Sequence, residues 1–149
     1  MFPPRRVSPT LVLVCCLTVG ILALTGGAIA ETPGADSTDA TAERSLNTTG
    51  PEPGETVTVT LTVDLQSASS INYLDDFDPA FAGGTFVNAT ENGTDIFPLF
   101  QSVNSDLALV AFDNGTGPGT VETTYRVTVP SDADPGTVYS LNGTLQVNG

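Results

Sequence analysis

The stretch ETVTVTLTVDL, Glu55–Leu65, alternates strictly between two kinds of side chain. From Val57 onward every odd-numbered position carries Val or Leu, and every even-numbered position carries Thr or Asp. A period of two residues predicts a β-strand with one face buried and the other in water. We therefore expect the valines and leucines to form core, and the threonines to form a solvated face of high β-propensity.

The chain after residue 43 repeats this pattern. Short β-forming runs are separated by turns rich in Gly, Pro, Asn and Asp, and no run has the period of a helix. Seven or eight such strands predict an all-β fold, an antiparallel β-sandwich of immunoglobulin-like type. Pro98 should hold its run at a sheet edge. The expected strands lie at 44–49, 55–65, 70–77, 85–90, 96–103, 106–112, 120–129 and 137–147.

The charge of the chain restricts its partners. There are 17 acidic residues against four arginines, with no histidine, and every acid follows residue 30. Such a surface repels nucleic acid and anionic lipid, so neither is expected to bind. Molar salt shortens the Debye length to about 3 Å and suppresses repulsion between the acids. The composition therefore favours a halophilic source over an acidic secreted protein from a moderate habitat.

Residues 1–30 have the three parts of a secretory signal peptide. Arg5 and Arg6 provide a positive start, and an apolar run follows at Leu11–Leu24. A small-x-small site then ends at Ala30, so cleavage is expected between Ala30 and Glu31. We expect this segment to form a signal helix and to direct the chain to the cell surface or the extracellular space.

The alternative for the same segment is an uncleaved membrane anchor. Residues 11–30 are just long enough to span a bilayer as a helix, and they would be the chain's contact with the membrane. Residues 31–43 are rich in Ser, Thr, Ala and Asp and predict a flexible acidic leader. The sandwich domain is expected at 44–149. Both cysteines, Cys15 and Cys16, lie in the apolar run, so cleavage would leave no disulfide or thiolate.

The mature chain lacks the residues of most catalytic centres. Without His, Cys or Lys it cannot build a nucleophile–base triad or a Schiff base. Two carboxylates can catalyse glycoside hydrolysis, but the acids here lie mainly in turns, where their pKa values should stay ordinary. We therefore expect no enzyme.

The densest acidic cluster is LDDFDP, which contains Asp75, Asp76 and Asp78. Carboxylates at the end of a strand can bind Ca²⁺ through oxygen, and no other cofactor is expected. The alternative is a solvated turn, since Asp78-Pro79 is a good turn initiator. An exposed Tyr73 beside Asp75 and Asp76 would favour a site for carbohydrate or Ca²⁺.

Two further features bear on contacts outside the chain. Phe97, Leu99 and Phe100 surround Pro98 and form either an exposed patch for a partner or, in our preferred interpretation, part of the core. Five Asn-x-Ser/Thr motifs are expected to accept glycans in an exported chain. Two of them, at Asn92 and Asn114, are also Asn-Gly turn dipeptides, which is an alternative explanation. The five asparagines are Asn47, Asn88, Asn92, Asn114 and Asn142.

The strings PEPGETVTVTLTVDL, DDFDPAFAGGTFVNAT and VETTYRVTVPSDADPGTVYSLNGTLQV together resemble a module of haloarchaeal secreted and surface proteins. That module is an immunoglobulin-like or cohesin-like β-sandwich, and the resemblance covers Arg44–Gly149. It implies adhesion or scaffolding through contact with a cell-envelope or other extracellular protein. Binding of polysaccharide or Ca²⁺ is the alternative. Relatives usually continue into one more strand, so an open sheet edge is expected unless a partner supplies that strand.

Overall fold

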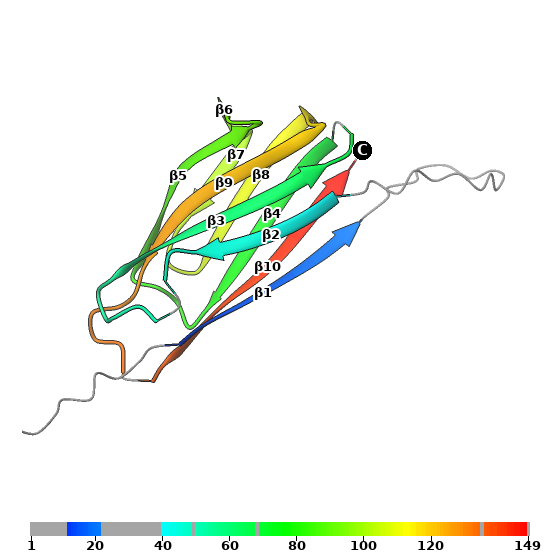
Figure 1. The fold of residues 1–149 in the computed structure, drawn as a ribbon. Coiled ribbons are helices and arrows are strands. Elements are labelled where there is room, and N and C mark those ends of the chain that lie inside the picture. The colour runs from blue at the N-terminus through cyan, green and yellow to red at the C-terminus, as the bar shows by residue number, and fades with distance from the viewer. Residues whose placement is uncertain (1–11, 22–39, 49, 68, 135, 149) are drawn as a thin grey trace, which may run out of the picture.

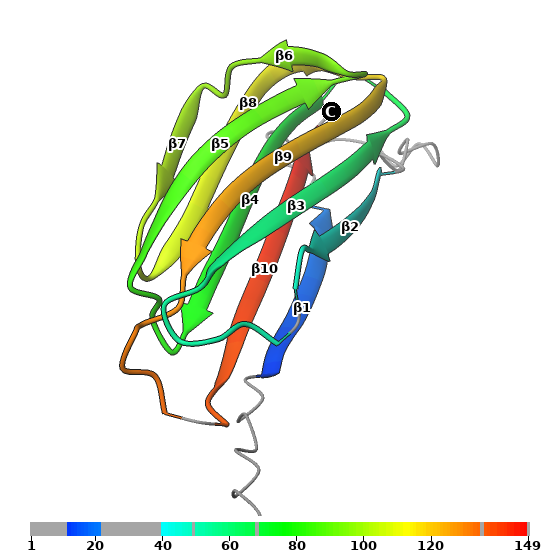
Figure 2. The same ribbon diagram turned by 60° about the vertical axis from the view of Figure 1, so that its left-hand side comes forward.

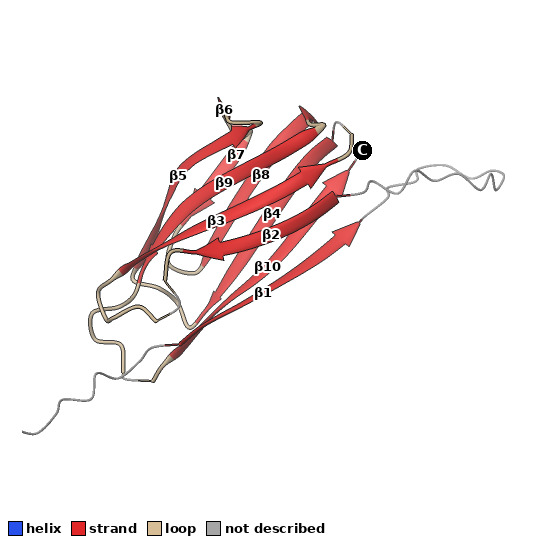
Figure 3. Cartoon of the chain, viewed as in Figure 1, coloured by secondary structure: helices blue, strands red, loops and turns tan. Residues whose placement is uncertain are grey.

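The structure is a computed structural model that describes residues 12–21, 40–48, 50–67, 69–134 and 136–148 (Figure 1). Ten strands form two five-stranded sheets that pack face to face (Figures 1 and 2). All regular elements within the described ranges are strands (Figure 3). The expected all-β antiparallel two-sheet sandwich is therefore confirmed.

The first sheet has the strand order β1-β10-β4-β8-β7, and the second has the order β2-β3-β9-β5-β6. Every described strand pair is antiparallel except β1 with β10, which is parallel. The strands of the first sheet are β1 (Val12–Ile21), β10 (Val138–Asn148), β4 (Ser69–Asp78), β8 (Leu107–Thr116) and β7 (Phe100–Val103). Those of the second are β2 (Ala40–Leu46), β3 (Thr56–Leu65), β9 (Gly119–Thr128), β5 (Gly83–Glu91) and β6 (Thr94–Ile96).

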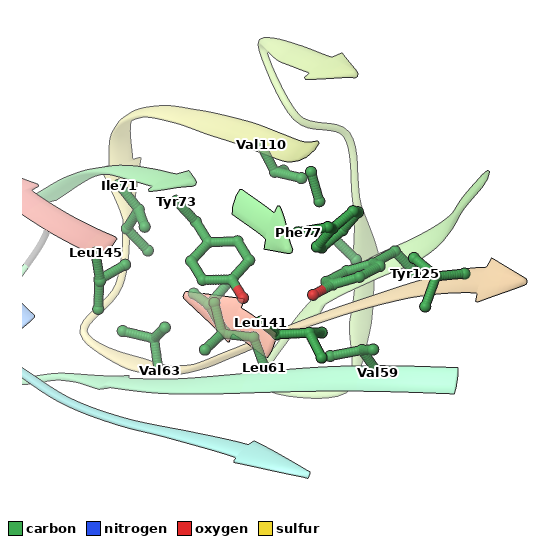
Figure 4. Packing of buried hydrophobic residues seen from close by; sticks show 14 of the residues in the cluster. Val59, Leu61, Val63, Ile71, Tyr73, Phe77, Val110, Tyr125, Leu141 and Leu145 are labelled. Carbon is green, nitrogen blue, oxygen red and sulfur yellow. The ribbon is translucent and has the colours of Figure 1, made fainter. Parts of the chain in front are cut away.

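The core lies between the sheets and follows the alternation of the sequence. On β3 each of the five expected residues from Val57 to Leu65 is buried, while the threonines between them are half-buried and Asp64 is exposed. Strands β9 and β10 alternate in the same way. Figure 4 shows side chains from β3, β4, β8, β9 and β10 meeting in one layer. Burial of such side chains at about 1.5–3 kcal/mol each holds the sheets together.

Aromatic rings close one end of this layer. Phe81 lies in the loop after β4 and packs edge-on against Phe77, with ring centroids 5.2 Å apart. It also stacks on Tyr139 of β10 at 4.9 Å. The backbone N–H of Phe81 donates to the carbonyl of Ser105, 2.8 Å away. Phe81 therefore covers this end of the core, while Asp78, Pro79 and Ala80 of the same turn are exposed.

Several strand bounds differ from expectation, and β8 runs to Thr116, four residues past its expected end at 112. Strand β2 begins at Ala40, four residues before the expected start at Arg44, because Ala40 and Ala42 continue its inward-facing period. The expected single strand at 96–103 is split into β6 and β7, which belong to different sheets. The link between them carries Pro98 around the side of the sandwich.

The apolar N-terminal run is also extended where it is described. Residues 12–21, which we expected in a signal helix, form β1 and pair with β10 over ten residues. The backbone of β10 is free to pair on that side, and an uncharged run containing valine and isoleucine can satisfy it. The cleavage site at Ala30–Glu31 lies outside the described residues. Among the residues that the structure describes, no helix is long and apolar enough to cross a membrane.

Candidate functional site

Three apolar side chains are exposed on one side of the sandwich, and we call them the β6–β7 patch. They are Phe97, Leu99 and Phe100, whose exposed fractions are 93%, 76% and 52%. Our preference for packing in the core was wrong. The link from β6 to β7 crosses between the outer edges of the two sheets, where the interior is already filled by residues such as Val110 and Phe112.

The β6–β7 patch continues onto the neighbouring strand. Val87 of β5 is exposed, and it lines a depression of about 270 Å³ together with Ile96 and Phe97. Asp95 also lines this depression. Apolar side chains and a carboxylate therefore lie side by side on this surface.

A second cluster lies inside the sandwich and consists of Arg44, Asp75, Tyr73 and Tyr125. The hydroxyls of Tyr73 and Tyr125 both donate to Oδ2 of Asp75, and they face one another between the sheets (Figure 4). Nη2 of Arg44 donates to Oδ1 of the same carboxylate. The side chains of Arg44 and Asp75 are 1% and 0% exposed.

Arg44 directs its remaining side-chain donors to the opposite sheet. Its Nε and Nη2 donate to the hydroxyl oxygen of Tyr73, at 3.2 and 2.8 Å. Its Nη1 donates to the carbonyl of Leu141 on β10, at 2.8 Å. Strand β2 belongs to one sheet, whereas β4 and β10 belong to the other. The guanidinium therefore links the two sheets.

Burial dominates the electrostatics of this cluster. It raises the pKa of Asp75, against the opposing effects of the Arg44 guanidinium and the two tyrosine hydroxyls. It also raises the pKa of Tyr73 and of Tyr125 well above the ordinary tyrosine value. No buried side-chain polar atom in the described part of the chain lacks a hydrogen-bond partner. The cluster is satisfied internally and is closed to a substrate.

The three aspartates considered for Ca²⁺ are not brought together. Asp75 faces the core, whereas Asp76 and Asp78 are exposed on the opposite face of β4. Within the described ranges, no three acidic or cysteine side chains are grouped so as to hold a metal ion. An exposed Tyr73 would have favoured a site for carbohydrate or Ca²⁺, but Tyr73 is buried.

The predicted glycan acceptors differ in their surroundings. Asn88 on β5 and Asn142 on β10 are exposed within strands. The side chain of Asn47 accepts a hydrogen bond from the N–H of Thr58 at 2.7 Å. Asn92 has a positive φ of 50° in the turn between β5 and β6. The Asn-Gly turn is therefore present at Asn92, whereas the expected turn at Asn114 is wrong, because Asn114 lies within strand β8.

The side chain of Asn92 is enclosed by the turn that precedes β9. Its Oδ1 accepts from the N–H of Thr120 at 3.0 Å. A Cβ added to Gly119 would lie 2.5 Å from its Nδ2. A sugar on that nitrogen would compete with these contacts, which makes Asn92 a poor acceptor in the folded chain.

Sequence reasoning missed the role of Arg44, although a signal was present. Arg44 stands in phase with Ala42 and Leu46, on the inward face of its strand. Asp75 likewise stands in phase with Tyr73 and Phe77. A charged residue in the apolar phase of a strand requires a buried partner, and two such residues of opposite charge could have been paired.

Comparisons with known proteins return similarities of fold. No protein family matches the sequence, and no curated protein matches it. One similar solved structure is a non-cellulosomal cohesin from the hyperthermophilic archaeon Archaeoglobus fulgidus, with 12% identity and a TM-score of 0.40, over 64% of this chain and 82% of that one. Another is BslA, a bacterial hydrophobin, with 15% identity and a TM-score of 0.28, over 74% and 93% of the two chains.

Replacing Asp75 with Asn leaves the Arg44 cation buried without its counter-charge. We expect the free energy of unfolding, measured by urea denaturation at fixed salt, to fall by about 3–5 kcal/mol. Arg44→Met should cost less, because Asp75 can then take up a proton. The exposed Arg126 of β9 is the control, and Arg126→Met should change stability by less than about 0.5 kcal/mol.

The pH dependence of Arg44→Met has a definite sign. A carboxyl whose pKa is raised in the folded state binds a proton that the unfolded state does not. Relative to the unchanged chain, the stability of Arg44→Met should therefore rise as pH falls from 7 toward 4. Equal effects of Asp75→Asn and Arg126→Met would contradict the buried ion pair.

Alkaline titration tests the two buried tyrosines. Unfolded tyrosines ionise near pH 10, whereas Tyr73 and Tyr125 keep their protons in the fold. The folded state then binds more protons, and stability falls as pH rises above about 10. At least two of the three tyrosines in the chain, Tyr73 and Tyr125, should gain tyrosinate absorbance only as the β-sheet circular dichroism disappears. Reversible ionisation of all three with the fold intact would contradict this.

Glycopeptide mass spectrometry of the protein from its own cells tests the acceptor sites. We expect sugar at Asn88 and Asn142 in preference to Asn92, because the side-chain amide of Asn92 accepts from the N–H of Thr120 and donates to the carbonyl of Pro118. Gln substitutions at Asn88 and Asn142 should each remove one glycan mass. Predominant occupancy of Asn92 would show that local packing does not decide acceptance.

Proposed function

We propose that the chain is an exported, non-catalytic β-sandwich module that binds another protein at the cell surface or outside the cell. The observation that carries this proposal is the exposure of the β6–β7 patch. Large contiguous apolar surfaces are uncommon on monomeric proteins, and they mark sites of contact. Phe97, the most exposed member at 93%, contributes almost none of its ring to its own fold.

The chemistry of the patch indicates the kind of partner. Aromatic side chains at the centre of an interface contribute much of its binding energy when they enter a pocket. The net charge of the whole chain is −13, and Asp95 borders the patch. The fitting partner is therefore a protein surface with an apolar pocket and a basic rim, which would also be attracted by charge.

The remaining chemistry of the chain supports binding over catalysis. Asp75, whose pKa burial raises, is enclosed by two tyrosines and an arginine. A general acid or base must reach its substrate within hydrogen-bond distance. Asp75 cannot do so in this fold, because its side chain is fully buried.

A photo-crosslinking residue, p-benzoylphenylalanine, placed at position 97 in the producing cells tests the patch. We expect a crosslink to one protein that purified unmodified chain competes away. The triple variant Phe97→Ser, Leu99→Ser, Phe100→Ser should fail to compete. It should also bind the purified partner at least about tenfold more weakly, because aromatic anchors dominate such interfaces.

Two controls separate binding from folding and from chance contact. The crosslinker at Glu122, exposed on the outer face of β9, should not give the same product. The urea midpoint of the triple variant should stay unchanged, because all three side chains are exposed. Crosslinks to lipid alone, or full competition by the triple variant, would reject the patch as a protein-binding site.

A further inference from the structure

Without β1, the edge strands of the two sheets are β10, β7, β2 and β6. These four strands differ in how well they are protected against pairing with another strand. Strands β6 and β7 have only three and four residues. Strand β2 has seven residues and carries Glu43 and Arg44. Strand β10 has eleven residues, VYSLNGTLQVN, without a charge or a proline. Short strands, charges and prolines are the usual devices that prevent a sheet edge from pairing, and β10 has none of them.

The backbone groups that β10 offers at its outer edge can be identified. The N–H of Phe77 on β4 donates to the carbonyl of Asp106, away from β10. Phe77 is the register partner of Leu141, so the backbone N–H and C=O of Leu141 face the outer edge. Along a strand, the backbone N–H and C=O groups of every second residue point to the same side. Gly143 and Leu145 therefore face outward as well, whereas Asn142 and Thr144 face β4.

Strand β1 occupies this edge in the structure. It pairs with β10 in parallel, from Val12 opposite Val138 to Ile21 opposite Val147, without a break in register. In a parallel ladder with Leu141 facing outward, the N–H groups of even-numbered β1 residues face β10. Figures 1 and 2 both show β1 lying along β10 at the margin of the sheet. The edge thus accepts a continuous strand of ten residues.

We propose that the outer edge of β10 is a strand-binding site, which residues 12–21 fill in the full chain. In the chain from which residues 1–30 have been removed, an extended segment of a partner protein fills it in parallel. That segment is apolar at alternate positions and carries no acid. Main-chain hydrogen bonds provide the affinity, as in other cases of strand addition to an open sheet edge.

The chemistry of this segment follows from β10 and β1. The β1 residues in register with buried Leu141, Leu145 and Val147 are Cys15, Val19 and Ile21, which are all apolar. The exposed side chains of β10 are uncharged, while the chain as a whole is acidic. An acidic segment would be repelled, whereas an uncharged one can pair.

This site is separate from the β6–β7 patch. Strands β1 and β10 lie at one margin of their sheet, and β7 lies at the other. Binding at β10 therefore goes beyond the proposed function, and either site can fail without the other. The Phe97→Ser, Leu99→Ser, Phe100→Ser variant should bind a β10 ligand as the unchanged chain does.

The test uses the full chain with a protease site placed within residues 31–39 and then cut. The probe is a fluorescent peptide of residues 12–21, with both cysteines replaced by Ala and a Gly-Ser tail. We expect saturable binding of one peptide per chain, with release of the cut N-terminal segment. No binding at millimolar peptide, or binding without saturation, would overturn the proposal.

N-methylation of the peptide backbone supplies a matched pair of probes. Methyl groups at positions 14, 16 and 18 remove N–H groups that face β10, and should weaken binding at least about tenfold. Methyl groups at positions 13, 15 and 17 lie on the far edge, and should change it by less than about threefold. Equal effects of the two series would overturn strand pairing. Because the methyl groups are on the peptide, neither series alters the folding of the domain.

Amide hydrogen exchange locates the binding on the protein. Before the peptide is added, the cut chain should be freed of its N-terminal segment by dilution. The amides of Gly143 and Leu145 should then exchange quickly and become protected when the peptide binds. The amides of Asn142 and Thr144, which face β4, should be protected in both states and serve as the control. Protection confined to the β6–β7 patch, or dimerisation in place of peptide binding, would reject the site.

Discussion

A carboxylate and a guanidinium that share one dry space between the sheets are the contact on which the fold depends. Arg44 comes from the edge of one sheet and Asp75 from an inner strand of the other, so neither charge can be satisfied unless the sheets stack in this register. Two tyrosine hydroxyls complete the carboxylate's shell. Apolar layers alone would tolerate small shifts of one sheet against the other. The buried charge pair is satisfied in one alignment of the sheets.

The same pair shapes one side of the sandwich. Arg44 also holds the outward carbonyl of Leu141, so the guanidinium lies between the β2 edge and the β10 edge. Gly143, the register partner of Asp75, places no side chain on the inward face beside it. The opposite side has short strands and an exposed aromatic link instead. The two sides of one small domain therefore offer different kinds of contact, main-chain pairing on one and apolar side chains on the other.

Local patterns explain which parts of this structure could be predicted. The burial of Val57 and Leu61 follows from the alternation of their own strand, which can be read from the eleven residues Glu55–Leu65. The inward phase of Arg44 and of Asp75 can be read from each strand, whereas the contact between them depends on how the two sheets are stacked, which no local period records. The exposure of Phe97 likewise depends on a link that passes around the outside, although its composition is that of a core segment. Pairing of residues 12–21 with β10 joins the two ends of the sequence and lies beyond any local rule.

Strand β1 has a consequence for the timing of synthesis. The ten residues that form it belong to the stretch that we propose as an export signal, and such a signal is recognised while it is accessible and not paired in a sheet. In a newly made molecule that folds early, β1 is already paired with β10, and the proposed export signal is then inaccessible. Recognition for export and pairing with β10 then compete for the same ten residues. The relative rates of the two processes determine how much of the protein is exported.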